Sequence, residues 1–180
     1  ALADLGVEQL AEEEESFSSQ VRATMLLDMS DVADRLLERG AGRFPAAAAL
    51  LRAEVAQTEG DWPAMERHLQ RAIDHGQDGE AIYLAMVLSH LQQDDSAAAE
   101  RAAQDGIQAT NDEGGRLHYN LACLRARRGA ISSALDALEE AIARGHRRPD
   151  LLAQDPDLNA LRDDPRFEAL RQRVAENPRP

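Results

Sequence analysis

The chain has 180 residues, of which 43% are hydrophobic, and a formal net charge of −13. A chain of this length and apolar content can bury a core, which excludes general disorder, and its single cysteine excludes an intrachain disulfide or a cysteine-rich zinc module. All 20 basic residues are arginines and 33 residues are acidic, so the surface as a whole repels a phosphate backbone and we expect no nucleic-acid partner.

Residues 1–45 show helical periodicity without a clear repeat. Apolar residues cluster at Leu2, Leu5 and Leu10, then from Val21 to Leu27, then from Val32 to Leu37, which predicts two or three helices. We interpret the stretch from Gly40 to Pro45 as a connection between helices and not as a domain boundary. This segment is either a degenerate repeat or an N-terminal cap.

Three segments with a common pattern follow. Each has a turn and then small or apolar residues at matching positions: Gly60-Asp61-Trp62 before Met65, Leu69, Ala72 and Ile73; Asp94-Asp95 before Ala99, Ala103, Gly106 and Ile107; and Gly129-Ala130-Ile131 before Ala134, Leu138, Ala141 and Ile142. Ile73 and Ile107 are 34 residues apart, and Ile107 and Ile142 are 35 apart. A period of this length with helical apolar spacing predicts stacked helix-turn-helix units.

These positions resemble the tetratricopeptide repeat (TPR) family. The third segment, with Tyr119-Asn120-Leu121-Ala122 before its turn, matches best. The second departs from the pattern because Asp94 replaces the turn glycine and Ala103 replaces a large residue. The stretch from Asp155 to Phe167 resembles the terminal segment of many bacterial members, and its two Asp-Pro steps are typical of helix starts.

The fold class that follows is all-α: a right-handed α-solenoid of stacked antiparallel helix hairpins, with capping helices at both ends. We predict N-terminal helices in residues 1–45, three repeats in 46–145 (about 46–79, 80–114 and 115–145) and a C-terminal capping segment in 146–180. In that segment Leu158, Leu161, Phe167, Leu170 and Val174 are expected to cover the apolar end of the last repeat.

No pattern of catalytic or metal-binding residues is present. The five histidines are scattered, and no His-Glu-x-x-His, Cys-x-x-Cys, phosphate-loop or nucleophile-elbow motif occurs. Cys123 is expected to be a buried small residue, and the pairs Asp94-Asp95 and Asp163-Asp164 are expected to cap helices. We therefore expect no enzyme activity, no catalytic residues, no cofactor and no metal.

The resemblance implies a groove lined by the first helix of each repeat. Carried onto this chain, it assigns to the groove Leu50, Glu54, Leu84, Leu88, Leu91, Arg116, Tyr119, Asn120, Cys123 and Arg127. Such a surface, apolar in the middle and arginine-bearing at one end, matches an amphipathic helix or an extended peptide with an acidic end. The alternative is that Leu84 and Leu88 belong to the core or to an intramolecular cap.

The function predicted from these observations is a non-catalytic scaffold or adaptor that binds a peptide or helix of a partner protein. The alternative is a regulatory or sensory repeat domain of a larger signalling protein such as a kinase or cyclase. Because no apolar stretch approaches the length of a membrane span, we expect no membrane insertion. Self-association stays open. The default location is the cytoplasm, with a removed leader as the alternative.

Overall fold

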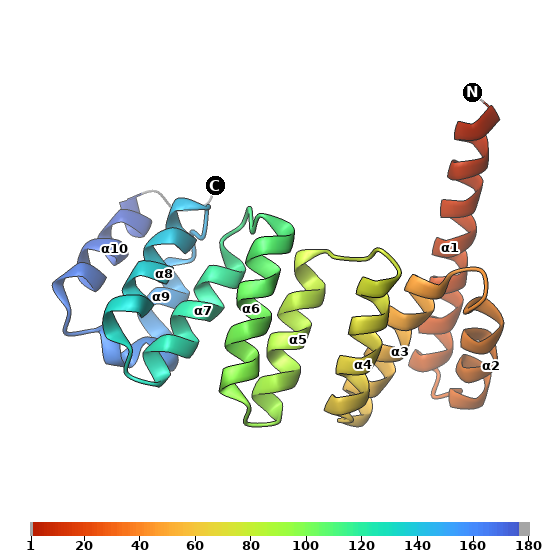
Figure 1. The fold of residues 1–180 in the computed structure, drawn as a ribbon, viewed down its shortest axis with the longest axis horizontal. Coiled ribbons are helices and arrows are strands. Elements are labelled where there is room, and N and C mark those ends of the chain that lie inside the picture. The colour runs from red at the N-terminus through yellow and green to blue at the C-terminus, as the bar shows by residue number, and fades with distance from the viewer. Residues whose placement is uncertain (1, 177–180) are drawn as a thin grey trace. The chain divides into compact units, whose positions relative to one another are not determined.

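The computed structural model describes the chain from residue 2 to residue 176, with side chains from Gln9 onward. The described residues form ten α-helices and one 3-10 helix, and no strand occurs among them. The helices are α1 (Leu2–Leu26), α2 (Ser30–Gly40), α3 (Pro45–Glu59), α4 (Trp62–Asp74), α5 (Glu80–Gln92), α6 (Ser96–Thr110), α7 (Arg116–Arg127), α8 (Ile131–Ala143), α9 (Pro149–Gln154), η1 (Pro156–Leu161) and α10 (Pro165–Glu176). Figure 1 shows them as successive helices joined by short connections.

The helices group into two compact units, which divide after Gln77. In the first unit α1 packs against α2 and α3, and α3 pairs with α4. Its core includes Val21 of α1, Leu37 of α2 and Leu51 of α3. The predicted apolar groups at residues 2–10 and 21–26 therefore belong to one continuous helix, α1, and Leu27 lies in the turn that follows it.

The second unit contains the hairpins α5–α6 and α7–α8 and the C-terminal helices. Helix α7 contacts both α5 and α6, so the two hairpins stack in sequence order. This all-α arrangement of stacked hairpins confirms the predicted fold class. Among the described residues, none of the helices combines the length and apolarity that a membrane span requires.

The hairpin turns repeat one backbone geometry. In each turn the backbone N–H of the second residue donates to the carbonyl oxygen five residues earlier: Asp61 to Ala56, Asp95 to His90, and Ala130 to Arg125, all at 2.9 Å. The residue before each donor has positive φ, +72° at Gly60, +57° at Asp94 and +79° at Gly129. Asp94 thus adopts the left-handed conformation that glycine favours, which fixes the register of the second repeat.

Aspartates cap several of these helices, as predicted. Oδ1 of Asp61 accepts from the N–H of Ala64 at the start of α4, and Oδ1 of Asp95 accepts from the N–H of Ala98 at the start of α6. Asp155 and Asp164 likewise accept from backbone N–H groups at the starts of η1 and α10. Of the two Asp-Pro steps, the first begins a 3-10 helix and the second an α-helix.

The aligned small residues form the interior of the hairpins. Ten of the twelve residues matched across the three repeats are buried: Met65, Leu69, Ala72, Ala99, Ala103, Gly106, Ala134, Leu138, Ala141 and Ile142. Gly106 shows why small residues are needed, because a Cβ there would lie 2.5 Å from Cβ of Tyr83. Close approach of α5 and α6 therefore depends on the missing side chain.

The C-terminal helices close the last hairpin. Helix η1 packs against α7 and α8, and α10 packs against α8 and α9. The five residues predicted to form the cover, Leu158, Leu161, Phe167, Leu170 and Val174, are all buried in the core of the second unit. Apolar surface that a further repeat would bury is thus covered by the chain itself.

Candidate binding surface

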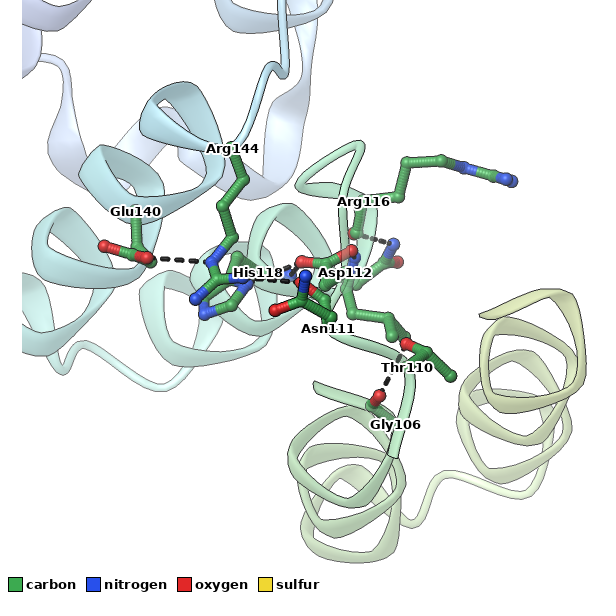
Figure 2. Close-up of polar contacts among 10 residues, drawn as sticks. Gly106, Thr110, Asn111, Asp112, Arg116, His118, Glu140 and Arg144 are labelled. Atoms are coloured by element: carbon green, nitrogen blue, oxygen red, sulfur yellow. Dashed lines mark hydrogen bonds and ion pairs between the residues drawn. The ribbon is translucent and has the colours of Figure 1, made fainter. Parts of the chain in front are cut away.

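The connection between α6 and α7 positions the start of α7, where several predicted groove residues lie. Asp112 in this connection is 1% exposed. Its two carboxylate oxygens accept hydrogen bonds from the backbone N–H groups of Leu117 and His118, each at 3.0 Å. Figure 2 shows Oδ2 of Asp112 also facing Nδ1 of His118, 2.5 Å away. A carboxylate at a helix N-terminus satisfies free N–H groups and interacts favourably with the helix dipole.

The same connection is held by α8. Arg144, at the end of α8, donates from Nη1 to the carbonyl oxygen of Asn111 at 2.5 Å and pairs with Glu140 at 2.8 Å (Figure 2). Gly115 has φ +64°, and a Cβ on it would lie 2.1 Å from the carbonyl oxygen of Ala141. The first turn of α7 is therefore fixed against α8 by both polar contacts and close packing.

A cleft of about 500 Å³ opens beside this first turn. It is lined by residues from the α6–α7 connection, from α7, from the connection between α8 and α9, and from α9 itself: Gly114, Arg116, Tyr119, Asn120, Gly145, His146, Arg147, Arg148 and Leu151. Three of these are arginines, and the lining contains no acidic side chain. The residues that line the cleft thus carry a net positive charge in a chain whose net charge is −13.

Two of the three guanidinium groups of the cleft form loose or local ion pairs. Arg116 has a side chain that is 61% exposed and lies 3.6 Å from Glu80. Arg148 pairs with Asp150, two residues along the chain, at 2.9 Å, and its side chain is 54% exposed. The pKa of the Asp150 carboxyl is lowered, and the main cause is its hydrogen bond from Arg148. Arg147 forms no ion pair with any residue that the structure describes.

Tyr119 forms one wall of the cleft and is itself buried, at 7% exposed. Its hydroxyl donates to Oδ2 of Asp155 at 2.7 Å, and its ring stacks on that of His146 with the centroids 4.2 Å apart. Burial, and then the hydrogen bond to Asp155, raise the pKa of Tyr119 well above its usual range. Tyr119 therefore offers a partner little surface, because Asp155 and His146 already contact it.

Cys123 lies one turn further along α7, facing the same segment. Its sulfur and the carboxylate oxygens of Asp155 and Asp157 lie within 4.8 Å of one another. Burial, and then the two neighbouring carboxylates, raise the pKa of the Cys123 thiol above its usual range. A metal ligand must be a thiolate, and Asp155 is already hydrogen-bonded to Tyr119 and to the N–H of Asp157. We interpret this cluster as structural.

Except for Asn120, the other predicted groove residues of the second unit lie apart from the cleft. Leu84, Leu88 and Leu91 follow one another along α5 and are each half-buried, and Leu91 packs against the core of the second unit. Arg127, at the end of α7, is exposed and lies 3.9 Å from Asp157. Asn120 lines the cleft, and its side-chain amide donates to the carbonyl oxygen of Arg116.

Two predicted groove residues belong to the first unit. Leu50 is half-buried on α3. Glu54, on the same helix, accepts two hydrogen bonds from the guanidinium of Arg22 on α1, at 3.0 and 2.6 Å. The pKa of Arg22 is raised, and the main cause is its hydrogen bonding to Glu54.

Of the predicted groove residues, the structure thus brings Arg116, Tyr119 and Asn120 together around one cleft. Sequence reasoning did not assign Arg147 and Arg148 to a binding surface, since adjacent arginines after a repeat are usually solvated helix ends. The signal available was their place in the chain, immediately after the third repeat and before the capping helices.

The fold can be compared with solved structures. YrrB, whose structure is described as "a TPR protein with an unusual peptide-binding site", superimposes with a TM-score of 0.61 over 97% of this chain and 92% of its own, at 9% sequence identity. The MamA protein gives a TM-score of 0.63 over 92% of this chain and 88% of its own, at 15% identity. The chain has the TPR fold. No protein-family model matches the sequence, and the comparison with curated proteins gives no match.

At these identities the likeness establishes the TPR fold alone. The hairpins α5–α6 and α7–α8 fall within residues 80–114 and 115–145, where the sequence predicts the second and third repeats. The arginine-lined cleft lies at the start of α7 and extends along the connection into α9.

Proposed function

We propose that this chain is a non-catalytic protein-interaction scaffold, which binds a peptide or helix of a partner protein. The observation that carries the proposal is the cleft lined by Arg116, Arg147 and Arg148. In this proposal the cleft receives the acidic end of the partner segment.

The chemistry of the cleft suits a carboxylate-bearing ligand. A guanidinium presents a planar set of N–H donors that matches a carboxylate in a two-point hydrogen bond. Arg116 and Arg148 have side chains more than half exposed, so they can turn toward a ligand at little cost in lost packing. Because the remainder of the chain is strongly acidic, an acidic ligand is repelled elsewhere and is attracted to this cleft.

Apolar contacts would come from α5. Leu84 and Leu88 are one helical turn apart and half-buried, so a partner could cover the remaining surface of both. Helices α5 and α7 are in contact, which supports a continuous surface from these leucines toward the arginines. Helical or extended segments with apolar anchors and charged ends bind surfaces of this kind. The peptide-binding site named for YrrB supports the same class of function.

Affinity capture from a lysate of the source cells tests the proposal. Three baits are compared: the wild-type protein, an Arg147→Glu/Arg148→Glu variant, and an Arg101→Glu/Arg171→Glu variant. The control variant makes the same change of charge at two exposed arginines outside the cleft. Circular dichroism first verifies that all three baits have the same helix content.

We expect a partner that the wild-type and control baits retain in near-stoichiometric amount and the cleft variant loses. Its binding segment, mapped by truncation, should contain apolar residues followed by Asp or Glu residues, or by the chain's own C-terminal carboxylate. Retention by all three baits would contradict the assignment of the cleft. Failure of the wild-type bait to retain any protein above background would contradict the scaffold function.

A further inference from the structure

The turn between α1 and α2 in the first unit exposes a group of large apolar side chains. Leu26, Leu27 and Met29 are 88%, 70% and 44% exposed. They are three of the four large apolar side chains that are exposed among the described residues. Adjacent exposed apolar residues of this size mark surfaces that another molecule covers.

The backbone of this turn is fixed, so the exposure does not result from a frayed helix end. The N–H of Asp28 donates to the carbonyl oxygen of Met25 at 3.1 Å, and that of Met29 donates to the carbonyl oxygen of Thr24 at 2.9 Å. Asp28 has φ +57°, the left-handed conformation of a regular helix C-terminus. The leucines are thus presented on an ordered support.

A pocket of about 630 Å³ adjoins the turn, between the end of α1, the start of α2 and the end of α3. Its apolar surface is provided by Met25, Leu26, Ala33 and Val55. Its rim carries four carboxylates, on Asp28, Asp34, Glu54 and Glu59.

The rim is strongly negative. Its one arginine, Arg22, is held by Glu54 through two hydrogen bonds, which neutralises that carboxylate. Asp28, Asp34 and Glu59 form no ion pair with any residue that the structure describes. Three carboxylates without a basic partner therefore surround an apolar floor.

We propose that this pocket is a second docking site, which takes a basic amphipathic helix of a partner protein. The apolar face of that helix covers Leu26, Leu27 and the pocket floor, and its lysines or arginines pair with Asp28, Asp34 and Glu59. The partner differs in charge from the ligand of the arginine-lined cleft. The chain thereby joins two proteins of different surface chemistry.

Fluorescence anisotropy with designed peptides tests this site on the full chain. The probe is a labelled peptide of about 15 residues, with leucines at helical spacing along one face and lysines elsewhere. One control peptide has the same composition with the leucines distributed around the helix. A second control keeps the leucines and replaces every lysine by glutamate. The titrations are repeated with Leu26→Ser, with Asp34→Asn/Glu59→Gln, and with the matched variants Leu10→Ser and Glu38→Gln, which change exposed residues outside the pocket.

We expect the patterned basic peptide to bind at least about tenfold more tightly than either control peptide, because only it offers both an apolar face and cations. Leu26→Ser should weaken binding of this peptide about tenfold. Asp34→Asn/Glu59→Gln should weaken it several-fold and reduce the salt dependence of binding. Leu10→Ser and Glu38→Gln should bind as the wild type does. The Arg147→Glu/Arg148→Glu variant should also bind normally, which separates this site from the proposed function.

Equal binding of the patterned and scrambled peptides would overturn the proposal, and so would an unchanged affinity in Leu26→Ser. Sedimentation velocity on the same variants tests whether a second copy of this chain occupies the pocket instead. A wild-type dimer that Leu26→Ser converts to a monomer would mean that a second copy of this chain, and not a basic helix, covers the patch.

Discussion

The hydroxyl of Tyr119 donates a 2.7 Å hydrogen bond to Oδ2 of Asp155, which joins α7 to the segment that precedes η1. The two residues are 36 positions apart in the sequence. Their contact fixes the face of α7 on which the C-terminal helices pack. It also explains why Tyr119, predicted as a groove residue, is buried although it lines the cleft.

Removal of this hydroxyl should destabilise the protein moderately. In Tyr119→Phe the carboxylate of Asp155 loses a buried donor, which costs about 1–2 kcal/mol in the free energy of unfolding. Urea denaturation followed by circular dichroism measures the change. Tyr83→Phe is the control, because the Tyr83 hydroxyl has no hydrogen-bond partner among the described residues and its loss should cost less than about 0.5 kcal/mol. Equal effects of the two substitutions would contradict this account of Tyr119.

Two glycines with similar backbone conformations should respond very differently to alanine. Gly129→Ala places a Cβ in open space at φ +79°, so only the backbone cost of about 1–2 kcal/mol applies. Gly115→Ala adds an overlap with the carbonyl oxygen of Ala141, so we expect more than about 3 kcal/mol. Thermal and urea unfolding of the two variants measures the difference. A Gly115→Ala protein as stable as Gly129→Ala would show that α7 does not approach α8 as closely as described.

Stability should fall in alkaline solution because of Cys123. Burial and two carboxylates raise the pKa of its thiol, so the folded protein holds the proton more tightly than the unfolded chain does. The resulting stabilisation is fully present below the unfolded pKa of about 8.5 and is lost as the pH rises toward the folded value, at up to about 1.4 kcal/mol per pH unit.

Urea denaturation at several values between about pH 7 and pH 10 tests this expectation, with Cys123→Ala as the comparison. The variant lacks the thiol, so its free energy of unfolding should decline less steeply over this range. Tyrosines contribute to the decline only above about pH 10. Parallel declines for the wild type and Cys123→Ala would exclude the thiol as the cause.

Substitution of two leucines of α5 tests whether they form a binding surface or part of the core. Because Leu84 and Leu88 are half-buried, we expect Leu84→Glu/Leu88→Glu to retain most of its helix content and to weaken partner binding about tenfold or more. Circular dichroism and affinity capture together give the answer. Loss of the fold in this variant would mean that the two leucines are core residues of the second unit.

Much of the fold could be predicted because its determinants are local. The turn residues Gly60, Asp94 and Gly129 recur at a period close to the length of one helical hairpin. The small residues that follow each turn, at helical spacing, predict close contacts between helices. Asp94 made the register of the second repeat uncertain, since aspartate adopts positive φ less readily than glycine. The structure resolves it through the hydrogen bond from Asp95 to His90.

The parts of the surface that could not be predicted depend on long-range contacts. Nothing in the local pattern indicates that the buried Asp112 caps α7 from the preceding connection, or that Arg22 reaches Glu54 across 32 residues. The cleft likewise combines α7 with arginines that follow α8, and sequence alone does not bring these segments together. In the sequence, Leu26 and Leu27 belong to an apolar cluster that predicts a helix, and their exposure could not be predicted because it depends on what packs beside the helix end.

The central claim is that the cleft of Arg116, Arg147 and Arg148 recognises an acidic segment, and a charge-reversal titration tests it most directly. The probe is a labelled peptide of about 12 residues with two leucines followed by glutamates, compared with versions in which the glutamates become glutamine or lysine. The wild-type protein should bind the glutamate peptide at least about tenfold more tightly than the other two, and Arg147→Glu/Arg148→Glu should instead prefer the lysine peptide. If all three peptides bind the wild type equally, or if the variant keeps the wild-type preference, the cleft does not recognise acidic segments.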